Sequence, residues 1–431
     1  MYASAIHKGP YGMNDPLDIK APSPFMAVSS IIISMGMLAV GNGILFAFVP
    51  IKLAEAGFPP WVAGAIVTAL AGGGLVGCLI TGPMVRRVGH ARVFATLTAL
   101  NILGVLLIAA GIEPILWIVA RGLYGVSAAG LFIVSQSWLN DACENNWRGK
   151  IIAMFYMIYV LAIGGGALLL RYISLDGPQA PLLAIFFAAL AIFPVSLSRL
   201  PPPPPPASVT IAIRTVWRIS PVGLVGLLAV GGLTMLVQGF APIYASAVGY
   251  GKNDVALLMF LMQLGMIGVQ YPLGALSDRM DRRYVLIIAA IIVVVTASIA
   301  ARMDTRTLLW MALVFAVWAG ATEAIFSIAS AHANDRGDPE YYVSMSSTLL
   351  VAWSVSGMVL PALTTALTPI LGPEAFMFMA IAIAALYALF VLYRVTRREP
   401  PLEEDTEPHQ QISAQAPYPA DMLQQSSDDG T

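Results

Sequence analysis

The chain has 431 residues, of which 58% are hydrophobic and only 11% are charged, whereas an average globular protein has about 25% charged residues. So much apolar surface cannot be hidden in the cores of a few soluble domains, so part of it has to face lipid. This composition excludes a soluble enzyme, a nucleic-acid-binding protein and a coiled coil. The formal net charge of −1 indicates no polyanionic partner, and two cysteines cannot make a disulfide framework.

Twelve apolar runs follow one another along the chain, and each is long enough to cross a bilayer as a helix. The spans expected in the first half are 25–49, 60–83, 92–111, 114–139, 150–171 and 179–198. Those expected in the second half are 221–246, 254–276, 284–301, 307–331, 342–367 and 373–393. The runs lack the short alternation of barrel strands, so we expect an all-α integral membrane protein with twelve transmembrane helices.

Lysine and arginine are distributed unequally between the two ends of these spans. Seventeen lie on the side that holds both termini, five lie on the other side, and Arg121 lies inside a span, which accounts for all 23. Because cytoplasmic loops carry the excess of positive charge, we expect both termini in the cytoplasm. Residues 1–24 are polar and contain several prolines, so we expect no cleavable signal there, and we expect the polar, acidic tail over residues 395–431 to be disordered.

The spans divide into two halves of nearly equal length, 25–199 and 221–394, joined by a proline-rich linker over 200–220. The linker contains Pro201–Pro206, either a stiff polyproline II spacer or a low-complexity loop without special stiffness. An offset of 192 residues brings identical residues of the two halves into one register, which predicts a pair of pseudo-symmetric six-helix bundles. The aligned pairs are Pro50 with Pro242, Gly57 with Gly249, Gly73 with Gly265, Gly82 with Gly274, Arg87 with Arg279, and Ser135 with Ser327.

The connections after the second and eighth spans share a pattern of glycine and basic residues. The first reads Gly82-Pro-Met-Val-Arg86-Arg87-Val-Gly89-His-Ala-Arg92 and the second Gly274-Ala-Leu-Ser-Asp278-Arg279-Met-Asp-Arg282-Arg283. This pattern resembles the best-known motif of the major facilitator superfamily, and Arg121-Gly-Leu-Tyr-Gly125 looks like the family's second motif. The resemblance covers about residues 25–394. It implies a substrate site between the two bundles near mid-bilayer, lined by the first, fourth, seventh and tenth spans.

A finer resemblance lies at the end of the fourth span. Ser137-Trp138-Leu139, followed by Arg148-Gly149-Lys150, is similar to the YcaD-like bacterial members of the superfamily, which implies an inner-membrane location and no established substrate. The chain departs from those relatives at Gln136, where they usually have glutamate. It departs from the wider family at Arg86, which stands where the motif's first aspartate is expected, and it lacks the Gly-Pro signature of many drug antiporters in the fifth span.

Two charged side chains lie well inside the expected spans, Arg121 in the fourth and Glu323 in the tenth. A charge inside the membrane costs a few kcal/mol unless it meets water, a partner or a ligand. Arg121 lies about 10 Å from the outer end of its span and Glu323 about 24 Å from the outer end of its own. Because their depths differ, we expect no direct pairing. Glu323, with Ser327 one turn on, is either a proton carrier or a hydrogen-bonded structural residue. Arg121 binds an anionic group, tunes a carboxyl through water, or anchors backbone carbonyls.

The remaining candidate residues are neutral groups inside the spans and charged groups at their ends. The neutral candidates, which contact substrate or bond neighbouring helices, are Asn42, Gln136, Gln238, Gln263 and Tyr159. In the family resemblance, Asp278 meets the start of the fifth span near Arg148 and closes the cytoplasmic side; otherwise the motif arginines act only as topology signals. The expected conformational gate comprises Gly82, Arg87, Gly274, Asp278, Arg279 and Arg148.

Together these features predict a secondary active transporter that moves a small solute by alternating access, driven by protons. A multidrug exporter of amphipathic compounds is favoured instead if the cavity is wide and apolar, and the acidic tail makes a non-transporting sensor conceivable. An enzyme is not expected, because no cluster of His, Cys and carboxylates has metal-ligand spacing and no nucleophile has a base partner. We expect a monomer in the lipid bilayer that binds no cofactor, metal or nucleic acid.

Overall fold

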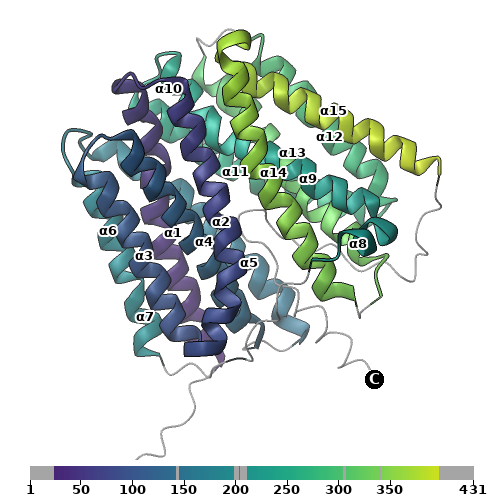
Figure 1. Ribbon diagram of the computed structural model, residues 1–431, viewed down its shortest axis with the longest axis horizontal. Coiled ribbons are helices and arrows are strands. Elements are labelled where there is room, and N and C mark those ends of the chain that lie inside the picture. Colours follow the sequence, from purple (N-terminus) through teal and green to yellow (C-terminus); the bar gives the residue numbers. More distant parts are fainter. Residues whose placement is uncertain are drawn as a thin grey trace, which may run out of the picture.

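The computed structural model describes residues 24–141, 145–198, 203, 211–303, 307–338 and 341–397. Within these ranges all regular structure is helical, and twelve helices are long and apolar enough to cross a membrane, which confirms the predicted fold class. Most of the N-terminal segment, the proline run and the acidic tail lie outside the described residues, as does Cys143. Figure 1 shows the first-half helices mainly on the left and the second-half helices mainly on the right, with their axes inclined, while α10 lies at the upper left against the first half.

Six spans make up each bundle. Those of the first half are α1 (Pro24–Glu55), α2 (Pro60–Val88), α3 (His90–Ala110), α4 (Pro114–Asp141), α5 (Asn145–Leu169) with the 3-10 turn η1 (Leu170–Tyr172), and α6 (Gln179–Leu190) with α7 (Ile192–Leu197). A short helix, α8 (Ile213–Ile219), lies within the expected linker. The spans of the second half are α9 (Pro221–Met235) continued by η2 (Leu236–Phe240) and α10 (Ala241–Ala247), α11 (Lys252–Ser277), α12 (Arg282–Ala300), α13 (Leu308–Asn334), α14 (Tyr342–Leu371) and α15 (Ala375–Val395).

Several helices continue past the apolar runs that predicted them. The helix α1 ends at Glu55 instead of residue 49, and Lys52 and Glu55 pair at 2.6 Å in its last turn. The helix α2 runs to Val88 and is ended by Gly89, whose φ of 83° suits a residue without Cβ. The expected loop after the second span was therefore wrong, since its motif from Gly82 to Arg87 is helical.

The repeated glycines bring helices of one bundle together. A Cβ atom on Gly73 of α2 would overlap the carbonyl oxygen of Gly122 in α4, and one on Gly265 of α11 would overlap that of Ala316 in α13. Small residues allow such backbone contact between membrane helices, which makes each bundle tightly packed. Gly57 and Gly249 also correspond, because both have positive φ in the turns after the first and seventh spans. The pseudo-repeat thus reflects equivalent contacts in three dimensions.

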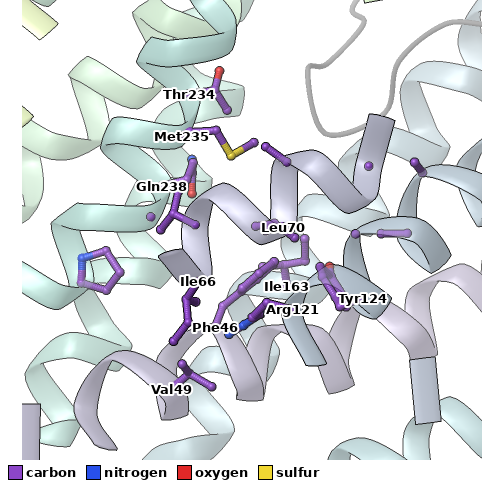
Figure 2. Close-up of a pocket in the computed structure, with 18 of the residues that line it drawn as sticks. Phe46, Val49, Ile66, Leu70, Arg121, Tyr124, Ile163, Thr234, Met235 and Gln238 are labelled. Carbon is purple, nitrogen blue, oxygen red and sulfur yellow. The ribbon is translucent and has the colours of Figure 1, made fainter. Parts of the chain in front are cut away.

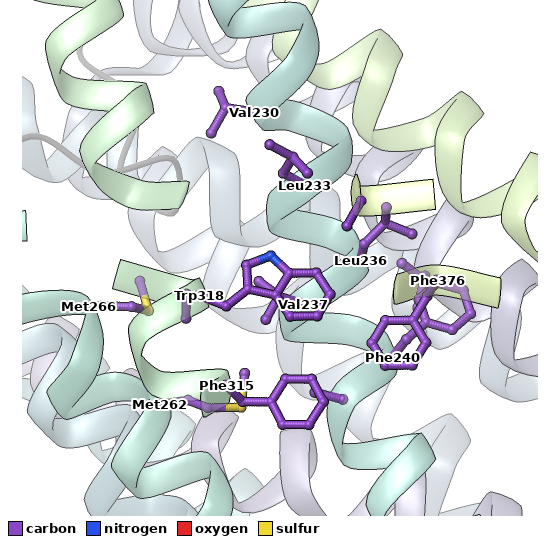
Figure 3. Packing of buried hydrophobic residues seen from close by; sticks show 14 of the residues in the cluster. Val230, Leu233, Leu236, Val237, Phe240, Met262, Met266, Phe315, Trp318 and Phe376 are labelled. Atoms are coloured by element: carbon purple, nitrogen blue, oxygen red, sulfur yellow. The ribbon is translucent and has the colours of Figure 1, made fainter. Parts of the chain in front are cut away.

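A cluster of large side chains fills the second bundle where η2 meets α13 and α15 (Figure 3). The ring of Phe376 stacks on Phe240, Phe315 and Trp318 with centroid distances of 5.9, 6.2 and 5.9 Å. All four side chains are buried. Stacked aromatic pairs of this kind contribute about 0.5–1.5 kcal/mol beyond their buried area, so this cluster holds α15 against the irregular part of the seventh span.

The two bundles touch each other near the end opposite the termini. Gly64 at the start of α2 packs on Thr365 of α14, and Gly239 in η2 packs on Val67 of α2. Lys252 at the start of α11 donates a hydrogen bond to the carbonyl oxygen of Ile173, with a distance of 2.8 Å. The bundles are therefore held together at this end, where α2 and α14 run side by side in Figure 1.

Replacement of Gly265 by alanine tests the backbone contact. The new methyl group would overlap the Ala316 carbonyl, so α11 and α13 would have to separate, at a cost of roughly 1–3 kcal/mol. We expect Gly265→Ala to lower the Tm of the detergent-solubilised protein by several degrees. Gly268→Ala on the same helix is the matched control, because a Cβ there meets open space. Equal Tm values for the two variants would contradict the close packing.

Candidate functional site

A cavity of about 160 Å³ lies between the two bundles (Figure 2). Its wall comes from α1, α2, α4 and α5 of the first half and from the seventh span, α11 and α14 of the second. One enclosed water needs about 10–15 Å³, so the cavity has room for several waters or for part of an organic molecule. The wall is mainly apolar, and its polar side chains are Arg121, Tyr124, Tyr159, Thr234, Gln238 and Cys78.

The expectation that the tenth span lines the cavity was wrong. No residue of α13, all of which is described, belongs to the wall, whereas α1, α4 and the seventh span do contribute as expected. The reason is packing within the second bundle, where α13 lies against α9, α11 and α12. The positions that face the first bundle are taken instead by Met259 on α11 and Trp353 on α14.

Arg121 is the charged residue of the cavity wall. It lies about 10 Å along α4 from its start, and 4% of its surface is exposed. Its Nη2 donates a hydrogen bond to the Leu45 carbonyl oxygen at 3.0 Å, and its guanidinium carbon lies 5.1 Å from the Phe46 ring centre and 5.8 Å from that of Tyr124. Its Nε has no partner among the described residues. Aromatic faces and one carbonyl thus surround this charge.

Two further candidates, Asn42 and Tyr159, join Arg121 in a polar chain across four helices. Asn101 of α3 donates a hydrogen bond to the Oδ1 of Asn42 at 3.4 Å. The Tyr159 hydroxyl is hydrogen-bonded to both Asn42 and Tyr124, and the Tyr124 ring lies beside the guanidinium. This series of hydrogen-bonded side chains connects the interior of the first bundle to the cavity wall, so it orients Tyr124 and Tyr159 at the site.

The candidates Gln238 and Gln263 meet at an irregular turn that sequence analysis did not predict. Pro242 has no N–H to bond the Gln238 carbonyl oxygen four residues earlier, and the chain there widens into the π-helical turn η2. Gln238 lines the cavity, and its Oε1 accepts a hydrogen bond from Gln263 at 3.4 Å. The signal for this turn in the sequence was Pro242, which follows Gln238 by four residues in an apolar run.

Five pathway candidates lie outside the cavity wall: Asn42 and Gln263, whose hydrogen bonds are described above, and Glu323, Ser327 and Gln136. Glu323 is 1% exposed on α13, about 22 Å along the helix from its start, and Ser327 donates a hydrogen bond to the Glu323 carbonyl oxygen at 3.3 Å. Gln136 is buried near the end of α4, and its carbonyl oxygen accepts a hydrogen bond from Asn140. The structure therefore does not bring Glu323 into the chamber that holds Arg121.

The gate candidates lie at the end of the molecule that carries the termini. Gly82 and Gly274 are buried in α2 and α11, whereas Arg87 and Arg279 are exposed. Asp278 follows the last turn of α11, and its Oδ1 lies 3.8 Å from the Nη1 of Arg282. The side chain of Arg148 lies outside the described residues, so a contact between Asp278 and the start of α5 stays a prediction.

A buried ion pair beside the gate was missed by sequence analysis. Arg282 Nε lies 2.7 Å from Asp335 Oδ2, and their side chains are 5% and 2% exposed. Next to it, Arg283 pairs with Asp281 at 2.6 Å; burial raises the pKa of Asp281, but the bonds and charge of Arg283 outweigh this and lower it overall. The signal in the sequence was Asp335, an acidic residue that follows the tenth span on the same side of the membrane as the motif arginines.

Metal ligation has no candidate within the described residues, where no group of three or more His, Cys, Asp or Glu side chains lies together. The polar chain, the glutamine pair and the lone guanidinium are groups that bind organic solutes by hydrogen bonds and charge.

Comparisons with known proteins agree with this arrangement. The Major Facilitator Superfamily family model matches residues 31–252 and 222–422. The chain belongs to the major facilitator superfamily. Among its relatives in this superfamily is the "Uncharacterized MFS-type transporter YcaD" of Escherichia fergusonii, 25% identical over 359 residues that make up 83% of this chain and 92% of the relative. The protein of that name from Salmonella typhi is 25% identical over 85% of this chain and 95% of its own length.

Solved structures of the superfamily share the fold. The nucleoside transporter NupG, crystallised as a point mutant, superposes with a TM-score of 0.71 over 86% of this chain and all of the other, with 11% identity. A D-xylose-proton symporter superposes with a TM-score of 0.64 over 88% of this chain and 99% of the other, with 12% identity. At such identities these likenesses establish the fold alone.

Removal of the Asp335 charge tests the missed ion pair. Asp335→Asn leaves the buried Arg282 guanidinium without its carboxylate, which costs about 3–5 kcal/mol when a buried pair is broken on one side. We expect a marked loss of Tm in detergent at pH 7. Asp278→Asn is the control, since its carboxylate is 37% exposed and 3.8 Å from Arg282, and its Tm is expected to change little. A similar Tm loss in both variants would contradict a special role for Asp335.

Proposed function

We propose that this protein is a secondary active transporter that moves a small solute across the inner membrane by alternating access. The observation that carries the proposal is the cavity between two separately packed bundles, with one buried charge in its wall. A solute in this position contacts both bundles, so their relative movement would change its access to either side of the membrane.

The arrangement of contacts supports a rocking motion. Glycine-mediated contacts between backbones hold α2 to α4 and α11 to α13 within their bundles, whereas between the bundles Gly239 and Gly64 meet the side chains of Val67 and Thr365. If both termini are cytoplasmic, as the distribution of basic residues favours, the closed contacts lie on the outer side. The proposed state of this structure is then inward-facing.

Proton coupling is the finer part of the proposal, and Glu323 is its carrier. A buried carboxyl group exchanges its proton only when water reaches it, so movement of α13 relative to the first bundle would control when Glu323 titrates. In this structure Glu323 is 1% exposed and outside the cavity. We propose that the outward-facing state, or an intermediate, connects it to water.

The mainly apolar wall favours a second candidate within the same class. Side chains such as Leu53, Ile66 and Met259 line most of the cavity, which suits compounds with an apolar body. Export of amphipathic compounds is thus the alternative to uptake of a polar metabolite. Direction decides between them, and transport of a solute supplied on one side of oriented vesicles measures it.

Substitution of Glu323 tests coupling. A screen of metabolites and drugs by thermal shift first identifies a ligand, which is then added to proteoliposomes that contain a pH-sensitive dye. We expect Glu323→Gln to abolish ligand-driven proton movement while exchange of the ligand continues. Ser327→Ala is the control, because this hydroxyl bonds its own helix backbone. Unchanged proton movement in Glu323→Gln would rule out this carrier, and wild-type protein without any ligand flux would contradict transport itself.

The proposed latch between Asp278 and the start of α5 closes the cytoplasmic side. In a Cys143→Ser background, Cys78 in the cavity wall reports opening through its rate of modification by a maleimide. Loss of the latch favours the inward-facing state, so we expect faster modification of Cys78 in Asp278→Asn. Asp278→Glu keeps the charge and serves as the control. Equal rates in Asp278→Asn and the parent protein would count against the latch.

A further inference from the structure

We infer that the solute bound in the central cavity is an amphipathic organic monoanion, with a carboxylate or similar group at Arg121 and an apolar, preferably aromatic, body. This inference depends on the proposed transport function, which it deepens by naming the substrate class. It follows from the charge of the cavity wall, the incomplete bonding of its polar groups and the character of the remaining wall.

The charge of the wall is positive and unbalanced. Arg121 lines the cavity, and no Asp or Glu is among the residues that do so in the described part of the chain. The ion pairs found among the described residues do not include Arg121. An arginine keeps its proton under all ordinary conditions. In an apolar surrounding this field attracts an anion and repels a cation, because low polarity strengthens both effects.

The bonding of the guanidinium is incomplete. Of its five N–H donors, one on Nη2 bonds the Leu45 carbonyl oxygen, and Nε has no partner in the part of the chain that the structure describes. The guanidinium carbon lies over the rings of Phe46 and Tyr124, at 5.1 and 5.8 Å from their centres, and these contacts help to position the group. A carboxylate that accepts from the guanidinium edge would complete its bonding and neutralise its charge.

The rest of the cavity indicates the body of the ligand. Figure 2 shows Thr234 at the top of the labelled group and Arg121 in its lower part, with Met235 and Leu70 between these two levels. The rings that line the cavity are Phe46, Tyr124, Phe132, Tyr159 and Trp353. Such a wall binds an apolar or aromatic body by burial and ring packing. The Thr234 hydroxyl, which is buried and has no partner among the described side chains and backbone, is available for a polar substituent of the ligand.

The competing interpretation is that Arg121 only anchors α4 to α1 through Leu45. The two interpretations differ in what they predict for ligands of equal shape and different charge. A structural anchor gives the cavity no preference among such ligands, and its loss lowers stability without a change in selectivity. A binding guanidinium makes the cavity prefer the anion, and its replacement removes the preference.

The test uses the purified full-length Cys143→Ser protein in detergent and three probes of similar shape: 4-phenylbutyrate, 4-phenylbutyramide and 4-phenylbutylamine. The readout is protection of Cys78, which lies in the cavity wall, against maleimide modification. We expect 4-phenylbutyrate to protect at a concentration at least about tenfold below that of the amide, as the gain from a charge-assisted hydrogen bond requires. We expect no protection by the amine.

Variants show which residue causes the preference for the carboxylate over the amide. Arg121→Gln should bring the carboxylate and amide within about twofold of each other, whereas Arg121→Lys, a point charge without the planar fork, should keep part of the preference. Arg171→Gln removes an exposed arginine outside the cavity and should leave the preference unchanged. If Arg121→Gln does not fold, the comparison of the three probes on the parent protein still decides the matter.

Three results would overturn the inference. The first is equal protection by the three probes, the second is an unchanged carboxylate preference in a folded Arg121→Gln protein, and the third is no protection at millimolar concentration by phenylacetate, 4-phenylbutyrate, 6-phenylhexanoate or octanoate. Failure of the transport proposal would look different. Anion protection without ligand flux in proteoliposomes contradicts transport alone, whereas flux restricted to neutral or cationic solutes contradicts the anion alone.

Discussion

Within lipid, every backbone N–H and C=O group has to be bonded inside the protein, and this constraint makes helices of all the described spans. The chain departs from α-helical bonding at η2, where Pro242 cannot donate to the Gln238 carbonyl. That departure lies between the cavity and the aromatic cluster, away from lipid. As a result Gln238 faces the cavity while Phe240 packs on Phe376. The backbone N–H that Pro242 lacks thus affects both the cavity wall and the aromatic cluster behind it.

The same constraint separates what is rigid from what can move. Helices with internally satisfied backbones attract each other through close packing, and the closest approach occurs where glycine removes the side chain. Gly73 and Gly265 place such contacts at equivalent positions within the two bundles. The interface between the bundles also pairs corresponding helices, α2 with α14 and α5 with α11, but its glycines, such as Gly64 and Gly239, meet side chains and not backbone. Movement at the interface therefore costs less than movement inside a bundle.

The lipid constraint also explains what sequence analysis predicted well. Apolar run length revealed twelve spans, and a repeat at a fixed offset revealed two bundles, since both features are linear in the chain. The composition of the cavity wall depends on how each helix is rotated and on what covers it. Arg121 and Glu323 were equal candidates by residue type, yet α4 turns one toward the cavity and the packing of α13 encloses the other. The buried partner of Arg282 depended on a contact 53 residues away.

The different locations of Arg121 and Glu323 bear on how charge and proton could be linked. Arg121 lines the cavity from the first bundle, whereas Glu323 is buried in the second bundle and outside the wall. Ligand binding and proton exchange at these two residues would therefore not compete for one position. Coupling between separate sites requires that each ligand favour one of two global states. In this fold the shared variable is the position of one bundle relative to the other, which determines both the shape of the cavity and the enclosure of α13.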